Sequence, residues 1–182
     1  MIWESQYWKD GLLRHAKDLR RRKKQRRWPE ASLARVEQDV MVAFYSIRKL
    51  IEAEKVATET KARPVVLQRH KWRGKQVTRM NWHKLNELYE LEESTSETRD
   101  LRWVANQLIH SYVFVVCFDD YGGFDGVFFT SDKNRNKSLH RIGVDQMIDL
   151  YEHVGTDYPN EMHMIMNPKT GDFDVHAVTN RD

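Results

Sequence analysis

The stretch Leu101-Arg-Trp-Val-Ala-Asn-Gln-Leu-Ile-His110-Ser-Tyr112 marks the point at which the pattern of this sequence changes. Before it, apolar side chains recur at three- and four-residue steps, which is typical of amphipathic helices. After it, short β-branched and aromatic runs alternate with turn residues, which is typical of strands. We therefore predict an α+β protein in which a helix ends at His110 and a strand follows directly.

The N-terminal part, residues 1–110, predicts a bundle of about four helices. The second segment has the clearest apolar stripe, formed by Leu33, Val36, Val40, Phe44, Ile47 and Ile51. Asn81 and Ser96 are the expected N-caps of the third and fourth helices. Between the second and third helices we expect an irregular excursion over 58–80, with a short strand at 64–67. The four helices are expected at 2–27, 30–56, 82–92 and 97–110.

Residues 111–182 predict a small antiparallel sheet with one helix, packed on the bundle as one unit. The helix is expected at 144–154, and the run Tyr112–Phe118 predicts a strand covered on both faces. A hairpin pairs 161–166 with 173–178. Its expected register sets Met166 opposite Phe173 and His163 opposite His176. Strands are expected at 112–118, 124–130 and 138–142.

Composition narrows the class of protein. Of the 182 residues, 40% are hydrophobic and 31% charged, as in a chain that buries a core. No apolar run reaches the length of a membrane span, and the N-terminus has no signal region. The single Cys117 excludes disulfides within the chain and a metal site built on cysteine. We expect a cytoplasmic protein without membrane contact.

The net charge is only +3, but the positive charges are clustered. Trp72 stands among basic residues, where it could stack on a base while Arg73 binds phosphate. We expect RNA or another polyanion as the partner. The alternative is a set of solvated faces balanced by acidic segments such as 87–97. The densest basic run predicts nucleic-acid contacts by Arg20, Arg21, Arg22, Lys23, Lys24, Arg26 and Arg27.

Arg102, Asn106 and His110 are spaced four residues apart and would form one polar stripe on a helix. Such a stripe suits acid–base work on a phosphodiester. His110 would move the proton, Arg102 would stabilise phosphate charge, and Asn106 would orient the imidazole. The alternative is a solvated helix face with a histidine favoured at its C-terminus by the helix dipole.

The segments Phe44-Tyr-Ser-Ile-Arg-Lys-Leu-Ile-Glu52 and Asn106–Tyr112 resemble a HEPN domain, and the resemblance covers residues 1–112. This helical superfamily includes metal-independent endoribonucleases of toxin–antitoxin and phage-defence systems. The resemblance implies catalysis by His110 without a metal or other cofactor, in a homodimer. The chain has Ala105 where the family has an arginine, and Arg102 stands one turn earlier.

A second hypothesis follows from Ala105. The protein would then be a non-catalytic interaction module, or an antitoxin-like subunit, that binds nucleic acid or an acidic protein partner through its basic patches. We predict no metal site, because His163 and His176 offer too few ligands for zinc. Asp119 and Asp120 precede two glycines and are expected to shape a turn.

Overall fold

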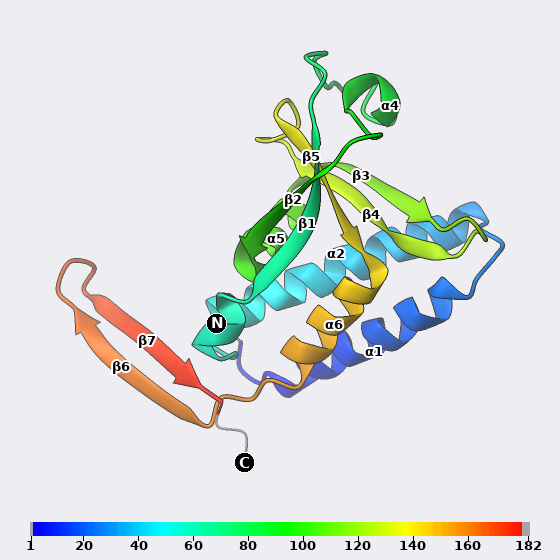
Figure 1. Ribbon diagram of the computed structural model, residues 1–182. Coiled ribbons are helices and arrows are strands. Elements are labelled where there is room, and N and C mark those ends of the chain that lie inside the picture. Colours follow the sequence, from blue (N-terminus) through cyan, green and yellow to red (C-terminus); the bar gives the residue numbers. More distant parts are fainter. Residues whose placement is uncertain (1, 180–182) are drawn as a thin grey trace.

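The computed structural model describes residues 2–179 of the chain. It has long helices at its N-terminal end, a five-stranded sheet in the middle and a separate hairpin at the end (Figure 1). The helices are α1 Gln6–Lys23, α2 Glu30–Glu52, α3 Thr58–Lys61, α4 Leu85–Leu88, α5 Leu101–Ile109 and α6 Val144–Gly155. The strands are β1 Pro64–Lys71, β2 Thr95–Asp100, β3 Ser111–Phe118, β4 Phe124–Ser131, β5 Ser138–Gly143, β6 Glu161–Asn167 and β7 Asp172–Val178.

The main sheet has the strand order β2-β1-β5-β4-β3, and all neighbours are antiparallel. Strands β2 and β3 are therefore its two edges. Helix α5 connects the edge strand β2 to the opposite edge strand β3, so it must cross a face of the sheet. This connection fixes where the side chains of α5 can lie.

The helices cover one face of the sheet. In Figure 1, α1, α2 and α6 lie together on the same side of the strands. Burial of the apolar stripe of α2 explains why this helix forms as the sequence predicts. The core between helices and sheet includes the fully buried Phe44, Ile47, Leu108, Val127, Phe129 and Tyr151.

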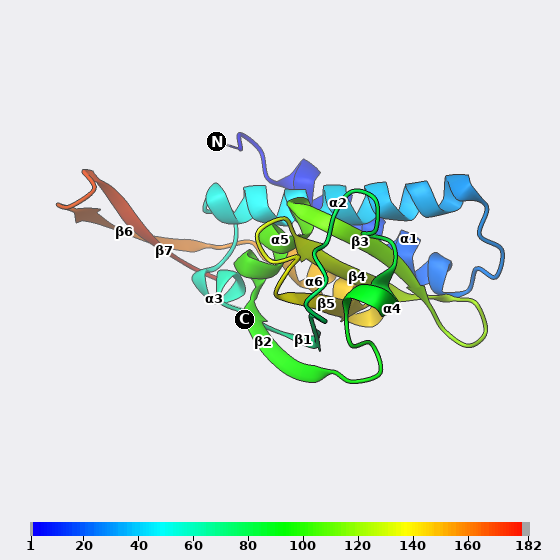
Figure 2. The ribbon, with the colours of Figure 1, turned by 90° about the horizontal axis from the view of Figure 1, so that it is seen from above.

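The other face of the sheet is only partly covered. Residues 72–91, which include α4, lie over one end of it (Figure 2). Tyr89 is fully buried there, and its hydroxyl donates to the backbone oxygen of Arg135 at 2.6 Å. Strand β3 is an edge strand with Phe118 exposed, so the expectation that this run is covered on both faces is corrected.

The predicted α+β class is confirmed, but the expected four-helix bundle is corrected. The helix expected over 82–92 is a single turn, Leu85–Leu88. The helix expected over 97–110 begins only at Leu101, because residues 95–100 pair with β1 as strand β2. Backbone pairing to an existing strand overrides the weak local preference of this polar segment.

The excursion expected over 58–80 contributes to the interior of the sheet. Strand β1 lies between β2 and β5, with Val65 and Leu67 buried and Val66 exposed. The predicted short strand was therefore the start of an eight-residue one. The sheet thus joins strands from before and after residue 110.

The C-terminal hairpin has the predicted register. Met166 pairs with Phe173, and His163 pairs with His176. Both views show the hairpin extending away from the sheet and the helices (Figures 1 and 2). Its apolar face is therefore half exposed, with Met164 58% and Phe173 50% exposed.

Among residues 2–179, no helix combines the length and the apolar character that crossing a membrane would require.

Candidate functional site

Helix α5 begins at a side-chain cap. The carboxylate of Asp100 accepts the backbone N–H of Trp103 at 2.6 Å. Leu101, Val104 and Leu108 are buried, so the opposite side of the helix faces outward. The N-cap is Asp100 and not the expected Ser96, because residues 95–100 are extended as strand β2.

The predicted stripe of α5 lies on this outward side. Arg102 and His110 are exposed and Asn106 is half-buried. Eight residues of helix place Arg102 and His110 about 12 Å apart along the axis. Burial, and then the positive charge of Arg102, lower the pKa of Lys61 in α3. Arg102 thus lies near α3, and the structure does not bring it to His110.

A different arginine lies beside His110. Arg48 of α2 places its Nη1 atom 3.4 Å from His110 Nε2, and its Nε atom donates to Glu52 Oε1 at 2.7 Å. A guanidinium can only donate, so His110 Nε2 is the acceptor in this contact. Sequence reasoning missed Arg48, because only the packing of α2 against α5 joins the two residues.

Asn106 adds a second unusual feature one turn before His110. Its backbone oxygen accepts the N–H of His110 at 3.2 Å. Its side-chain oxygen Oδ1 is buried and has no hydrogen-bond partner among the described residues. A buried acceptor without a donor is unfavourable, and this oxygen is closed to solvent, so a ligand could meet it only if the side chain turned outward. Asn106, His110 and Arg48 therefore form the candidate site.

Ala105, the residue before Asn106, is fully buried in the helix–sheet core. A long cationic side chain at this position would point inward and could not reach a bound phosphate. The cation at the candidate site is therefore supplied from α2 and not from the residue before Asn106.

The basic run at the end of α1 is partly engaged in ion pairs. Arg20 binds Glu152 and Lys23 binds Asp145, both on α6. Arg21 pairs with Asp18 within α1. The exposed Lys24 and Arg27 make no ion pair with any residue in the described part of the chain. Arg22 and Arg26 donate to Gln25 Oε1 and to the Lys23 backbone oxygen at 2.6 and 3.0 Å.

This basic segment is attached to the turn between β3 and β4. Trp28 Nε1 donates to the backbone oxygen of Gly122 at 2.8 Å, and the indole packs on Phe118. Asp119 accepts the N–H groups of Tyr121 and Gly123, as expected of a turn-shaping residue. Strand β3, eight residues long, separates this turn from His110, a span of about 26 Å.

Trp72 and Arg73 hold the segment over the second sheet face. Trp72 is half-buried, and its Nε1 donates to the backbone oxygen of Lys75 at 2.8 Å. Arg73 Nε donates to the backbone oxygen of Tyr89 at 3.0 Å. Base stacking by Trp72 stays a prediction, and its indole already has a structural partner.

Sequence reasoning also missed a cavity of about 600 Å³ near the base of the hairpin. His176 lines it together with His153, Thr60 and Arg63. His153 Nδ1 lies 3.0 Å from Arg63 Nη1, and its Nε2 lies 3.0 Å from Thr60 Oγ1. Because arginine only donates, Nδ1 accepts, so Nε2 has the proton and donates to Thr60. Both ring nitrogens therefore have partners within the fold.

Comparisons of the chain with profiles of known protein families, with curated proteins and with solved structures found no match.

Proposed function

We propose that this protein acts on RNA in the cytoplasm as a metal-independent endoribonuclease, as its resemblance to HEPN domains implies. The observation that supports this proposal best is the contact between Arg48 and His110, 3.4 Å apart on an exposed surface. It pairs a cation with an imidazole, which could stabilise charge on phosphorus and transfer a proton without a metal.

The proposed reaction starts with a phosphate that binds between Arg48 and His110. The bound phosphate accepts the N–H of Arg48 in place of His110, which frees the Nε2 lone pair of His110. This lone pair then accepts the proton of a ribose 2′-hydroxyl as the 2′-oxygen attacks phosphorus. The bond from phosphorus to the 5′-oxygen breaks, and this oxygen takes a proton from solvent. The products are a 2′,3′-cyclic phosphate and a 5′-hydroxyl. Arg48 stabilises the charge on the pentacoordinate phosphorus. Asn106 helps to position His110, whose backbone N–H donates to the Asn106 backbone oxygen.

The exposed Lys24 and Arg27 would bind the RNA backbone away from this site. An RNA that contacts both places has to extend along β3, over about 26 Å. We therefore expect cleavage to need an oligonucleotide longer than a dinucleotide. A homodimer would bring two copies of the α5 stripe together, as the resemblance implies.

The second candidate function is a non-catalytic interaction module, such as an antitoxin-like subunit, that binds nucleic acid or an acidic protein. Two observations favour it. Arg102 lies about 12 Å from His110 along α5, and Ala105 is buried in the core. This candidate predicts salt-sensitive RNA binding that does not depend on His110.

The test is incubation of wild type, His110→Ala and His163→Ala with structured RNA, with and without EDTA, followed by a denaturing gel. His163 is exposed on the hairpin and provides the matched control. The endoribonuclease proposal expects equal cleavage by wild type and His163→Ala in EDTA, ending in cyclic phosphates, and none by His110→Ala.

Two other outcomes would reject this assignment. Equal cleavage by all three proteins would place the activity elsewhere or in a contaminant. RNA binding without cleavage by any of them, measured by fluorescence anisotropy across a salt series, would select the interaction module.

A further inference from the structure

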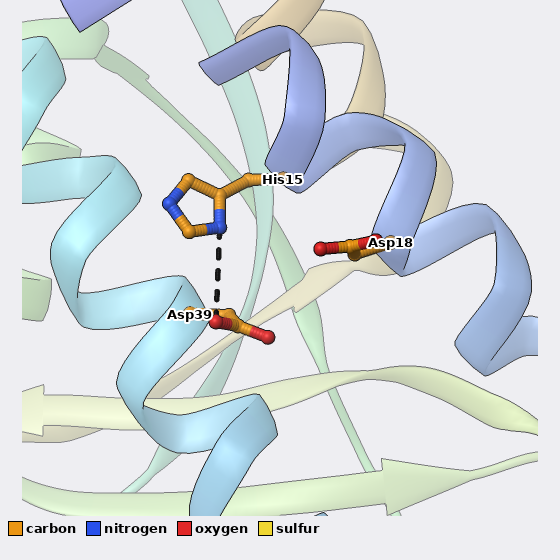
Figure 3. A group of neighbouring side chains, drawn as sticks. All are labelled: His15, Asp18 and Asp39. Atoms are coloured by element: carbon orange, nitrogen blue, oxygen red, sulfur yellow. Dashed lines mark ion pairs between the residues drawn. The ribbon is translucent and has the colours of Figure 1, made fainter. Parts of the chain in front are cut away.

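Three potential metal ligands meet where α1 packs against α2. His15 and Asp18 come from adjacent turns of α1, and Asp39 comes from α2. Figure 3 shows the three side chains turned toward one another across the helix interface. Their ligand atoms all lie within 4.8 Å of one another, and all three residues are half-buried.

The spacing suits a metal ion better than it suits a hydrogen bond. His15 Nδ1 lies 3.8 Å from Asp39 Oδ1, too far for a good hydrogen bond. Zinc binds histidine nitrogen and carboxylate oxygen at about 2.0–2.2 Å, so two tetrahedral ligands lie about 3.4 Å apart. Small rotations of these side chains would complete the geometry. His15 Nδ1 is itself buried without a hydrogen-bond partner in the described chain.

A buried hydroxyl provides an independent observation. Tyr151 of α6 is fully buried, and its hydroxyl has no hydrogen-bond partner among residues 2–179. Burial, and then the negative charge of Asp39, raise the pKa of this phenol, so the hydroxyl is within electrostatic reach of the cluster. Metal sites commonly use such a group to hold a ligating carboxylate or a bound water.

Three arginines lie close enough to repel a metal ion bound by these side chains. The strength of this repulsion depends on where each guanidinium lies. Arg21 pairs with Asp18, but its side chain is 80% exposed and can turn into solvent. Exposed ion pairs of this kind contribute little to stability. Arg22 and Arg35 act on Asp39 by charge, without a direct ion pair in the described chain. The two carboxylates therefore remain available to a divalent ion.

We propose that His15, Asp18 and Asp39 bind one divalent transition-metal ion of the zinc type, with water as the fourth ligand. The ion clamps α1 to α2 and so fixes the basic segment that connects them. This site is separate from the His110 site, and its role is structural. The proposal does not depend on the proposed function.

The test uses metal-free full-length protein titrated with Zn²⁺ by calorimetry and with Co²⁺ by visible absorption. We expect one ion per chain, a tetrahedral Co²⁺ spectrum and a rise in Tm with Zn²⁺. Asp39→Asn and His15→Gln should abolish all three signals. The control is Glu37→Gln, which removes an exposed carboxylate from the same helix as Asp39.

Circular dichroism of each metal-free variant checks that it folds. If Asp39→Asn does not fold, Asp18→Asn takes its place. Failure of wild type to bind, or Zn²⁺ binding by folded His15→Gln equal to that of wild type, would overturn the proposal.

Discussion

Arg48 Nη1 and His110 Nε2 lie 3.4 Å apart, although 62 residues separate them in the chain. The contact joins the C-terminal part of α2 to the C-terminal end of α5. Arg102, which shares a helix face with His110 in the sequence pattern, lies instead near α3. The sequence pattern predicts that Arg102 lies beside His110, whereas in the tertiary structure Arg48 occupies this place.

This arrangement predicts different effects for the two arginines. Arg48→Gln should lower the rate of RNA cleavage about 100-fold, the usual effect of removing one group that stabilises transition-state charge. Arg102→Gln should weaken RNA binding slightly and leave single-turnover cleavage almost unchanged. Single-turnover kinetics on a labelled RNA measure both. An equal loss in the two variants would contradict the assignment of Arg48.

The burial of Ala105 predicts that an arginine cannot be accommodated at this position. Ala105→Arg should reduce the free energy of unfolding by about 3 kcal/mol or more, because it buries an unpaired charge in a packed core. Urea denaturation measures the change. The control is Ala34→Arg at an exposed position of α2, which should be almost neutral. Equal stability of the two variants would mean that α5 packs differently.

The start of α5 predicts a cap effect. Asp100→Ala should reduce the free energy of unfolding by about 1 kcal/mol, because it leaves the Trp103 N–H without its acceptor. Asp100→Ser should keep most of the stability, since serine is also a good cap. Ser96→Ala should have little effect, because Ser96 lies in strand β2. A larger loss from Ser96→Ala than from Asp100→Ala would restore the cap that the sequence pattern predicts.

A buried histidine predicts the dependence of stability on pH. Burial lowers the pKa of His140 below 6.5, against the opposing effect of Glu97, whose carboxylate lies 2.6 Å from Nε2. The charges of Arg69 and Arg99 lower it further. Above pH 6.5 the ring is neutral in both the folded and the unfolded state. As pH falls from 6.5 to the folded pKa, the unfolded chain binds more protons than the folded chain, so stability is lost.

Urea denaturation between pH 8 and pH 5 tests this direction. The free energy of unfolding of wild type should fall below about pH 6.5. His140→Phe, which can still pack on Trp103 and Phe129, should lose less over the same range. His163→Gln is the control with an exposed histidine removed, and it should follow wild type. A pH profile of His140→Phe identical to that of wild type would assign the effect to other groups.

Local patterns predicted much of the fold. The apolar stripe of α2, the strand runs after His110 and the register of the β6–β7 hairpin depend on side chains close together in sequence. Patterns of this kind determine which face of an element is buried. The α+β class and the turn at Asp119 could therefore be predicted from the sequence alone.

The segments that were wrongly predicted depend on distant partners. Residues 95–100 are polar and show no strand period, and they are extended because β1 offers an edge to pair with. The same reason places residues 64–71 inside the sheet. Strand pairing is formed by hydrogen bonds between backbone groups, which every residue except proline can both donate and accept. Side-chain patterns therefore do not predict which segment pairs with the edge of a sheet.

By itself, the sequence determined the helical and strand-forming runs, the clustered positive charge and the polar stripe Arg102, Asn106 and His110. The tertiary structure decided which arginine lies beside His110, and it brought His15 and Asp39 together across the α1–α2 interface. The physical reason is that a periodic pattern gives the direction of a side chain relative to its own helix. The packing of helices against one another then decides which side chains meet.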